Sequence, residues 1–467
     1  ASQTPADPAA AADYTARDTP AHQPPVLRTR RCAGRAERFV LKQQTQRSIP
    51  PLCALLALTA ALTVYARCVL GYPICGTDEQ NYLKIFDWLD GGGSWPISGP
   101  GYAGLILELR DWTGLATRPL VAAVASLNSA FVLPLGLWLF YRIGLNDIRS
   151  AWWCLAFLFP GSYFLGPWLE GRPQQLGMLL AVAGAWLAHR HLRERGTCGP
   201  GFFLLWVLCF GYHILSFVVL TALVCGFWAR RFIQHRSGYD ALAAVLLGLA
   251  VCLALGEMWY PLLWLDIRTN HIRGAQAVVF SSELVVAAVG GLWVLHGLRA
   301  RQLNPSLVRR LRTGLALPLL PWLIAGLVGL ALLWQYTWLG SIYRAVKPWQ
   351  ILWYQGGNIL LAALFLTGLW RLIQKPVSDL EFFAESCVIL MVLGALFLLL
   401  TPWLRDHNWT LRIITYWTWY AAPIAVLGWW GLPAGWRWGV LLLCPPLLVG
   451  GLHHTLYAPT WTCQLNG

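Results

Sequence analysis

The chain has 467 residues, of which 57% are hydrophobic and only 12% are charged. Soluble domains carry about 25% charged residues, so this composition excludes one water-soluble core and predicts an all-α polytopic membrane protein. The net charge of +14 does not indicate a nucleic-acid partner, because the basic residues gather at the ends of apolar runs, as the positive-inside rule describes.

The N-terminal segment differs in composition from the rest of the chain. Residues 1–25 are rich in Ala, Pro and small polar residues, a composition typical of disorder. Residues 28–47 are strongly basic, with Glu37 as their one acid, and precede the first apolar run. We therefore expect 1–48 to be a disordered, basic, cytoplasmic segment and 49–460 to be the transmembrane domain.

Apolar runs near the length that crosses a bilayer recur along the rest of the chain. With the basic turns placed on the cytoplasmic side, they predict about 13 spans and an outer C-terminus. The abundant Trp residues favour an interfacial aromatic belt over a carbohydrate-lining role. Spans are expected near residues 50–70, 118–141, 150–168, 174–189, 239–257, 275–298, 314–337, 349–371, 384–403, 412–430 and 437–455, with a further apolar run at 202–228.

The apolar run at 202–228 is long for one span, and it ends in the basic residues 230–236. One tilted helix would leave those charges on the outer side, against the positive-inside rule. Two helices interrupted near Gly211, Tyr212 and His213 satisfy the rule, so we predict the broken pair. At His213, a buried and hydrogen-bonded imidazole is favoured over a ligand-binding one.

The largest outer loop, residues 71–117, carries the adjacent acids Asp78 and Glu79 just after the first span. Capping of a helix by Thr77 or Asp78 is one reading of this pair. The residues that follow predict a helix whose apolar face lies on the membrane surface. That face carries Tyr82, Ile85, Phe86 and Leu89; a Gly-rich turn then leads to a second amphipathic helix at 103–112.

Charged residues also stand in the other outer loops. Glu170 and Arg172 flank Gly171 between two expected spans, which reads either as an interfacial turn with an internal ion pair or as part of a site. An outer arginine opposes the positive-inside rule; phosphate binding is one reason for it, and a solvated loop is the alternative. The candidate phosphate ligands are Arg172, Arg344, Lys347, Arg405 and Arg412.

An acid pair after the first span, then a surface helix, a Gly-rich turn and the segment 98–102 ending in Tyr102, resembles the GT-C class of membrane glycosyltransferases. The likeness is greatest to the branch of protein O-mannosyltransferases and lipid A aminoarabinose transferases. It implies a GT-C-like bundle in which a sugar leaves a polyprenyl-phosphate carrier at the outer face. A carboxylate would act as general base; Asp78 matches the family's catalytic acid by position, and Glu79 is the alternative.

The resemblance also implies the partners. The donor would be a polyprenyl-phosphate-linked sugar, held by cations that stabilise the leaving phosphate, and the acceptor a glycan, lipid or protein hydroxyl. Residues expected near the acceptor or sugar are Tyr82, Tyr102, Glu170 and His407. No Cys/His spacing predicts a metal centre, and a divalent cation, Mg²⁺ or Mn²⁺, is left open. The composition favours a bacterial inner membrane, with the site facing the periplasm.

Other functions stay open. A transporter or flippase of lipid-linked or polar substrates would place acids and Pro/Gly breaks near the middle of the spans, whereas these acids collect in the outer loops. A surface polysaccharide polymerase or ligase usually has its largest outer loop late in the chain, and here it comes first. A purely structural membrane scaffold is the remaining alternative.

Overall fold

The structure is a computed structural model, and it describes residues 50–69, 71, 78–92, 100–169, 171, 173–235, 348–404 and 408–465. The chain divides into two units, Ala1–Cys53 and Ala54–Gly467, and nearly all described residues belong to the second. They form helices joined by turns, with no strand among the described residues, which confirms the all-α class. The spans expected near 239–257, 275–298 and 314–337 lie outside this part.

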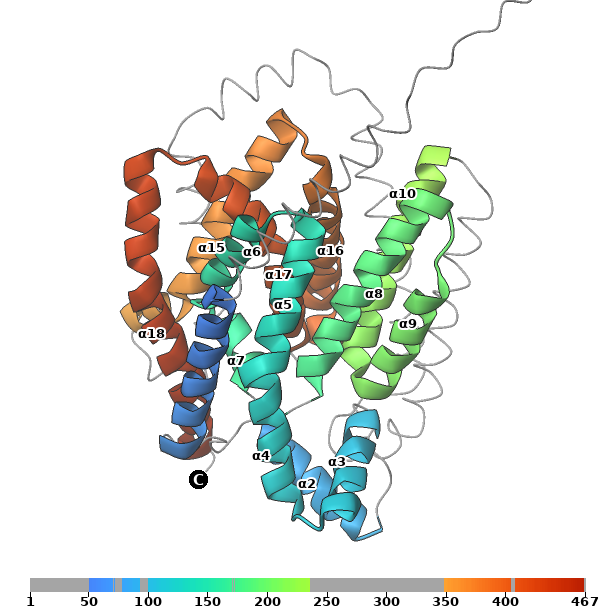
Figure 1. Cartoon of the computed structure of the whole chain (residues 1–467), viewed down its shortest axis with the longest axis vertical. Coiled ribbons are helices and arrows are strands. Elements are labelled where there is room, and N and C mark those ends of the chain that lie inside the picture. Colours follow the sequence, from blue (N-terminus) through green and yellow to red (C-terminus); the bar gives the residue numbers. More distant parts are fainter. Residues whose placement is uncertain are drawn as a thin grey trace, which may run out of the picture. The chain divides into compact units, whose positions relative to one another are not determined.

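The helices follow the order of the expected apolar runs (Figure 1). The first covers Pro50–Val69 and ends in the π-helical turn η1 (Tyr65–Val69). The others are α2 (Asp78–Asp90), α3 (Pro100–Thr113), α4 (Thr117–Leu127), η2 (Asn128–Val132), α5 (Leu133–Leu145), α6 (Ile148–Leu158), α7 (Ser162–Leu169), α8 (Gln174–Arg195), α9 (Pro200–Tyr212), α10 (Ile214–His235), α15 (Pro348–Gln374), η3 (Ser378–Leu380), α16 (Glu381–Leu404), α17 (Asn408–Trp430) and α18 (Ala434–Leu465).

Five helices in the described part are long and apolar enough to cross a membrane, which indicates a membrane protein. The total of about 13 spans stays a prediction, since it rests on length and charge alone. The five are Pro50–Val69, Thr117–Leu145, Ile214–Phe232, Trp353–Gln374 and Ala434–Thr455.

The span expected at 150–168 is instead two short helices, α6 and α7, so that prediction is wrong. Pro160 lies between them and has no N–H to continue a helix. Its carbonyl oxygen packs directly against Gly357 of α15 and Gly451 of α18, where an added Cβ would overlap it. The break therefore lets two later helices approach the backbone closely.

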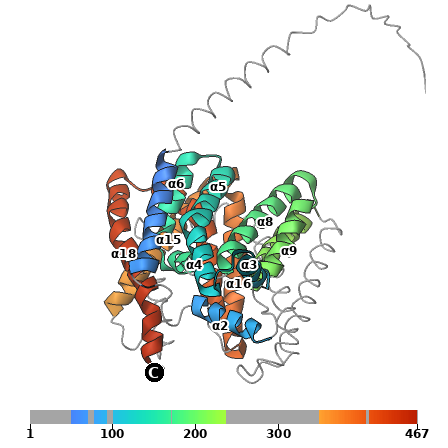
Figure 2. The same ribbon diagram turned by 60° about the horizontal axis from the view of Figure 1, so that its bottom comes forward.

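The predicted interruption at Gly211–His213 is confirmed. His213 has extended backbone angles (φ −158°, ψ 112°) between α9 and α10. The two helices pack against each other: Trp206 Nε1 of α9 donates to Thr221 Oγ1 of α10 at 2.9 Å, and the Trp206 ring contacts that of Phe217 at a tilt. Figure 1 and Figure 2 both show α9 beside α8, and α10 also packs against α8.

The expected loop helices are present as α2 and α3, but the apolar face of α2 serves a different purpose. Phe86 of α2 is buried in one cluster with residues of α3 and α4, and Tyr82 and Leu89 pack against that cluster. The sequence placed this face on the membrane surface, whereas much of it packs between helices. Trp88 and Trp112 stay exposed on the two helices.

Helices α15 and α17 touch backbone to backbone. A Cβ added to Gly368 would overlap the carbonyl oxygen of Ile424, and one added to Gly428 would overlap that of Leu364. Small residues at such positions let helices approach closely, which is how they associate in lipid. The two glycines therefore let α15 and α17 pack closely against each other.

Candidate functional site

The first element of the candidate site is an ion pair between the end of the first helix and the start of α2. Arg67, in η1, donates from Nη1 to Glu79 Oε1 at 2.9 Å and from Nη2 to Glu79 Oε2 at 2.8 Å. The two side chains are only 7% and 1% exposed. Parallel two-point pairing of this kind is the strongest arrangement for arginine and carboxylate.

The same pair reaches the connection between α7 and α8. Arg67 Nη2 donates to the carbonyl oxygen of Leu169 at 3.0 Å, and Gly171 N donates to Glu79 Oε2 at 2.6 Å. Tyr102 of α3 donates its hydroxyl to the carbonyl oxygen of Gly171 at 3.2 Å. We call Arg67, Glu79, Tyr102 and Gly171 the Glu79 cluster.

Gly171 fits the Glu79 cluster only because it has no side chain. A Cβ at this position would lie 2.8 Å from the carboxylate of Glu79 and 2.8 Å from Cβ of Ala125. Real Cβ atoms do not approach other atoms so closely, and both neighbours are held in helices. The glycine therefore allows the backbone of the α7–α8 connection to lie directly on the carboxylate.

The π-helical turn η2 holds Trp168, near the end of α7 and just before this connection. Trp168 Nε1 donates to the carbonyl oxygen of Ser129 in η2 at 2.7 Å. In return the carbonyl oxygen of Trp168 accepts from Gln175 Nε2 at 2.7 Å and from the Ser129 hydroxyl. A π turn disturbs the regular helix ladder, and side chains commonly satisfy its backbone groups. Side chains from several helices thus hold the backbone atoms of residues 168, 169 and 171 in place.

The two tyrosines expected near the sugar both belong to this region. The rings of Tyr82 and Tyr102 meet edge to face with their centroids 5.9 Å apart, and the ring of Tyr212 lies 6.4 Å from that of Tyr102. Burial, reinforced by the negative charge of Glu79, raises the pKa of Tyr102 well above its usual range. Its hydroxyl therefore stays protonated and acts as a donor to Gly171.

A second buried polar group follows the helix break. His213 Nδ1 lies 2.8 Å from Ser216 Oγ, which lies 2.5 Å from the hydroxyl of Tyr416 in α17. Ser216 N donates to the same Nδ1 at 3.2 Å, so in the neutral ring the proton is on Nε2. All three side chains are buried, which confirms the prediction of a buried, hydrogen-bonded His213.

Arg412 is the one predicted phosphate ligand that lies among the described residues. It precedes Tyr416 by one helical turn of α17, so the two share a face of that helix. That face carries the contact to Ser216 beside the break. The side chain of Arg412 is half-buried.

The remaining predicted site residues lie outside the described part. Asp78 is the first residue of α2, and its side chain is not described. Outside the description altogether are Glu170, Arg172, Arg344, Lys347, Arg405 and His407.

Arg67 is the main residue that sequence reasoning missed. It stands at the end of the first apolar run that the charge pattern predicts to be outside. The argument that singled out later arginines for opposing the positive-inside rule therefore applied to Arg67 as well. Ser216 and Tyr416 offered no signal, because a hydroxyl within an apolar run is common. Within the described ranges, no group of three or more His, Cys, Asp or Glu side chains could hold a metal ion.

The fold and the Glu79 cluster define a class of protein: an all-α membrane protein with a buried ion pair between Arg67 and Glu79. Through Glu79, this pair also hydrogen-bonds to the connection between α7 and α8. Neither the models of known protein families nor the curated proteins contain a match to this chain.

Proposed function

We propose that the chain is a GT-C-type glycosyltransferase that moves a sugar from a polyprenyl-phosphate donor to a hydroxyl acceptor. The observation that supports this proposal best is the 2.6 Å hydrogen bond from Gly171 N to Glu79 Oε2. It joins the acid pair to the connection 170–173, two segments that the sequence assigned separately to the base and to the donor phosphate. A shared site needs these segments to be neighbours.

The geometry favours Asp78 over Glu79 as the general base. Both oxygens of Glu79 accept N–H donors, from Arg67 and Gly171, so this carboxylate is committed to holding the loop. A base needs an oxygen available for the proton of the acceptor hydroxyl. Glu79 is therefore a positioning residue that fixes the start of α2, where Asp78 stands.

The proposed reaction is a single displacement at C1 of the sugar. The acceptor oxygen forms a bond to C1 of the sugar, while Asp78 takes its proton. The C1–O bond to the carrier breaks, and its electron pair leaves with the phosphate. Arg172 and Arg412 are the proposed cations near the developing negative charge, which they stabilise more than the neutral sugar.

A transporter is the second candidate, because discontinuous helices line the sites of many transporters. The breaks at Pro160 and His213 are of this kind. Just after the first break, the buried Ser162 hydrogen-bonds to the buried Gln355 and Asn358 of α15. Among the described residues, however, the one fully buried acid is Glu79, which already has its cation. A transporter of cations or protons would need another acid in these spans.

The test uses the full chain in lipid nanodiscs with two donor–acceptor pairs: synthetic polyprenyl-phosphate mannose with a Ser/Thr peptide, and polyprenyl-phosphate aminoarabinose with lipid A. Mass spectrometry follows the release of polyprenyl phosphate. We expect Asp78→Asn to lower the rate by about 10²- to 10⁴-fold, the usual contribution of a general base, with donor binding kept. Asp87→Asn, an exposed change on the same helix, is the matched control.

Full activity of Asp78→Asn would refute the proposed mechanism. If the wild-type chain leaves every donor intact yet moves one across the membrane of proteoliposomes, the transporter is correct.

A further inference from the structure

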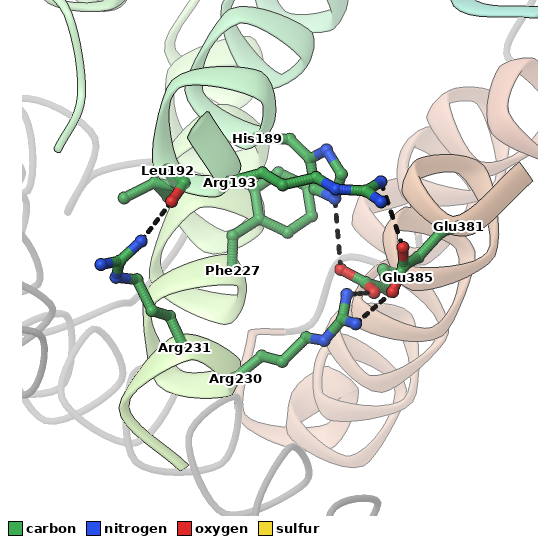
Figure 3. A pocket seen from close by; sticks show the side chains of 8 residues that line it. All are labelled: His189, Leu192, Arg193, Phe227, Arg230, Arg231, Glu381 and Glu385. Atoms are coloured by element: carbon green, nitrogen blue, oxygen red, sulfur yellow. Dashed lines mark hydrogen bonds and ion pairs between the residues drawn. The ribbon is translucent and has the colours of Figure 1, made fainter. Parts of the chain in front are cut away.

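A charged cavity of about 220 Å³ lies at the far end of α8 from the Glu79 cluster. Helix α8 has 22 residues and is therefore about 33 Å long, close to the thickness of a bilayer core. Side chains from the ends of α8 and α10 and from the start of α16 line the cavity (Figure 3). The charged or titratable ones are His189, Arg193, Arg230, Arg231, Glu381 and Glu385.

The glutamates form one wall of the cavity and hold Arg230. This arginine contacts both Glu381 and Glu385, and its side chain is 22% exposed. His189 Nε2 lies 3.6 Å from Glu385. Burial alone would raise the pKa of Glu381, but the hydrogen bond from Arg230 and nearby positive charges lower it below its usual value. Arg230 is therefore a structural cation that keeps α10 on α16.

The other two arginines face the cavity in a different way. Arg193 lies 3.3 Å from Glu381, yet its side chain is 60% exposed, so it can turn towards a ligand. Arg231 donates to the backbone carbonyl of Leu192 on the opposite side from the glutamates, as Figure 3 shows. Three arginines against two glutamates leave a surplus positive charge around the cavity.

We propose that this cavity binds the phosphate of an anionic phospholipid headgroup from the cytoplasmic leaflet, through Arg193 and Arg231. Basic pockets between membrane helices on that side are known to hold such headgroups, and these arginines belong to the basic turns that the positive-inside rule places there.

The size and chemistry of the cavity fit this ligand. It is smaller than the roughly 300–1,000 Å³ of pockets that enclose a whole ligand, so it suits one phosphate while the acyl chains stay in the bilayer. A guanidinium can bind two phosphate oxygens and is always charged. Arg230 keeps its glutamates, so lipid binding need not break the contact between α10 and α16.

The test compares the full chain in nanodiscs of phosphatidylcholine with and without phosphatidylglycerol, by thermal unfolding and by native mass spectrometry of bound lipid. We expect phosphatidylglycerol to raise the unfolding midpoint. In Arg193→Gln/Arg231→Gln we expect affinity for phosphatidylglycerol to fall by on the order of tenfold or more, since two charge-assisted hydrogen bonds are lost.

Arg190→Gln is the matched control. Arg190 lies on the same turn, but it is exposed, pairs with Glu194 at 2.8 Å and does not line the cavity. Glu381→Gln gives the opposite change: it removes a competing negative charge, so we expect phosphatidylglycerol to bind more tightly. This second variant keeps the test informative if the double variant fails to fold.

Three outcomes would overturn the proposal. The double variant could retain wild-type lipid affinity, or Arg190→Gln could lose as much affinity, which would indicate general surface attraction. Inorganic phosphate added to phosphatidylcholine nanodiscs could raise the midpoint equally, which would identify free phosphate as the ligand. None of these readouts depends on glycosyl transfer.

Discussion

Arg67 and Glu79 hold the start of α2 in place. The two side chains are buried and neutralise each other, and Glu79 also accepts the N–H of Gly171. The sequence identified the acid pair but could not decide which acid points inward. Neighbouring helix residues point about 100° apart, and the choice depends on the backbone of Gly171, far along the chain. The same long separation explains why Ser216 and Tyr416 were not foreseen as partners.

Glu79→Gln should destabilise the protein strongly, because it leaves a buried guanidinium without its counter-charge. Removing one partner of a buried ion pair typically costs about 3–5 kcal/mol in the free energy of unfolding. Arg67→Met/Glu79→Gln should lose less than Glu79→Gln alone. Denaturant unfolding in detergent measures both, with Asp87→Asn as an exposed control; equal loss in the single and double variants would contradict the pairing.

His213 directly precedes α10, and its Nδ1 accepts the backbone N–H of Ser216 in the first turn of that helix. His213→Ala should therefore lower the free energy of unfolding by about 1–2 kcal/mol, the usual effect of losing a helix cap. His213→Asn should recover part of that loss, because its side-chain oxygen can accept the same N–H. The measurement is again denaturant unfolding. An asparagine variant no better than alanine would show that capping is not the role of this ring.

At the scale of elements, sequence patterns located the helices better than their interruptions. The break at His213 was predicted because the basic residues after it violated a charge rule. The break at Pro160 was not, because no charge follows it and proline is tolerated inside spans. The break leaves the carbonyl oxygen of Pro160 packed against Gly357 and Gly451, which belong to distant helices, so its packing could not be read from the local sequence.

The α15–α17 contact gives a prediction at this scale. Gly368→Leu should separate the helices, because the new side chain overlaps the carbonyl oxygen of Ile424. We expect a loss of at least 1–3 kcal/mol in unfolding free energy, the usual range for overpacking. Gly439→Leu in α18 is the control, since a Cβ there meets nothing within 4 Å. Similar unfolding of both variants would contradict the close contact.

The corner formed by α8, α10 and α16 should be sensitive to acid. The pKa of Glu381 is lower in the folded chain than its ordinary 4.5, so its ionised form stabilises the fold above about pH 4.5. That stabilisation is lost as the pH falls through the folded pKa. Unfolding midpoints from pH 7 to pH 3 should therefore fall less in Glu381→Gln than in wild type or in Glu108→Gln, an exposed control on α3. Parallel curves would refute this role.

For the whole molecule, composition alone predicted the membrane class, because apolar length is a property of each segment by itself. The exposed tryptophans fit the expected belt: Trp88 and Trp112 lie on the loop helices, and Trp430, Trp436 and Trp438 surround the turn between α17 and α18. Function was less accessible, since a site depends on which loops meet, and that depends on packing between distant helices.

The two ends of α8 should lie on opposite sides of the membrane. Trp112 of α3, which is 85% exposed, reports on the side where α8 begins, and Arg195 reports on the side where it ends. With a membrane-impermeant maleimide, a single cysteine at Trp112 should be labelled in intact cells, whereas one at Arg195 should be labelled only after the cells are permeabilised. The unmodified chain, with its native cysteines, gives the background. Labelling of both positions from one face would refute this orientation, and with it the assignment of the arginine-lined cavity to the cytoplasmic leaflet.

The close contact between α15 and α17 also constrains the order of assembly during synthesis. Helix α16 lies between them in the chain, so α15 enters the membrane before its main partner has been made. Until α17 has been made, the surface of α15 at Gly368 lacks the helix that packs on it in the folded chain. A chain interrupted after α16 would therefore expose this unpaired helix surface to membrane quality-control proteases, and we expect such fragments to be short-lived.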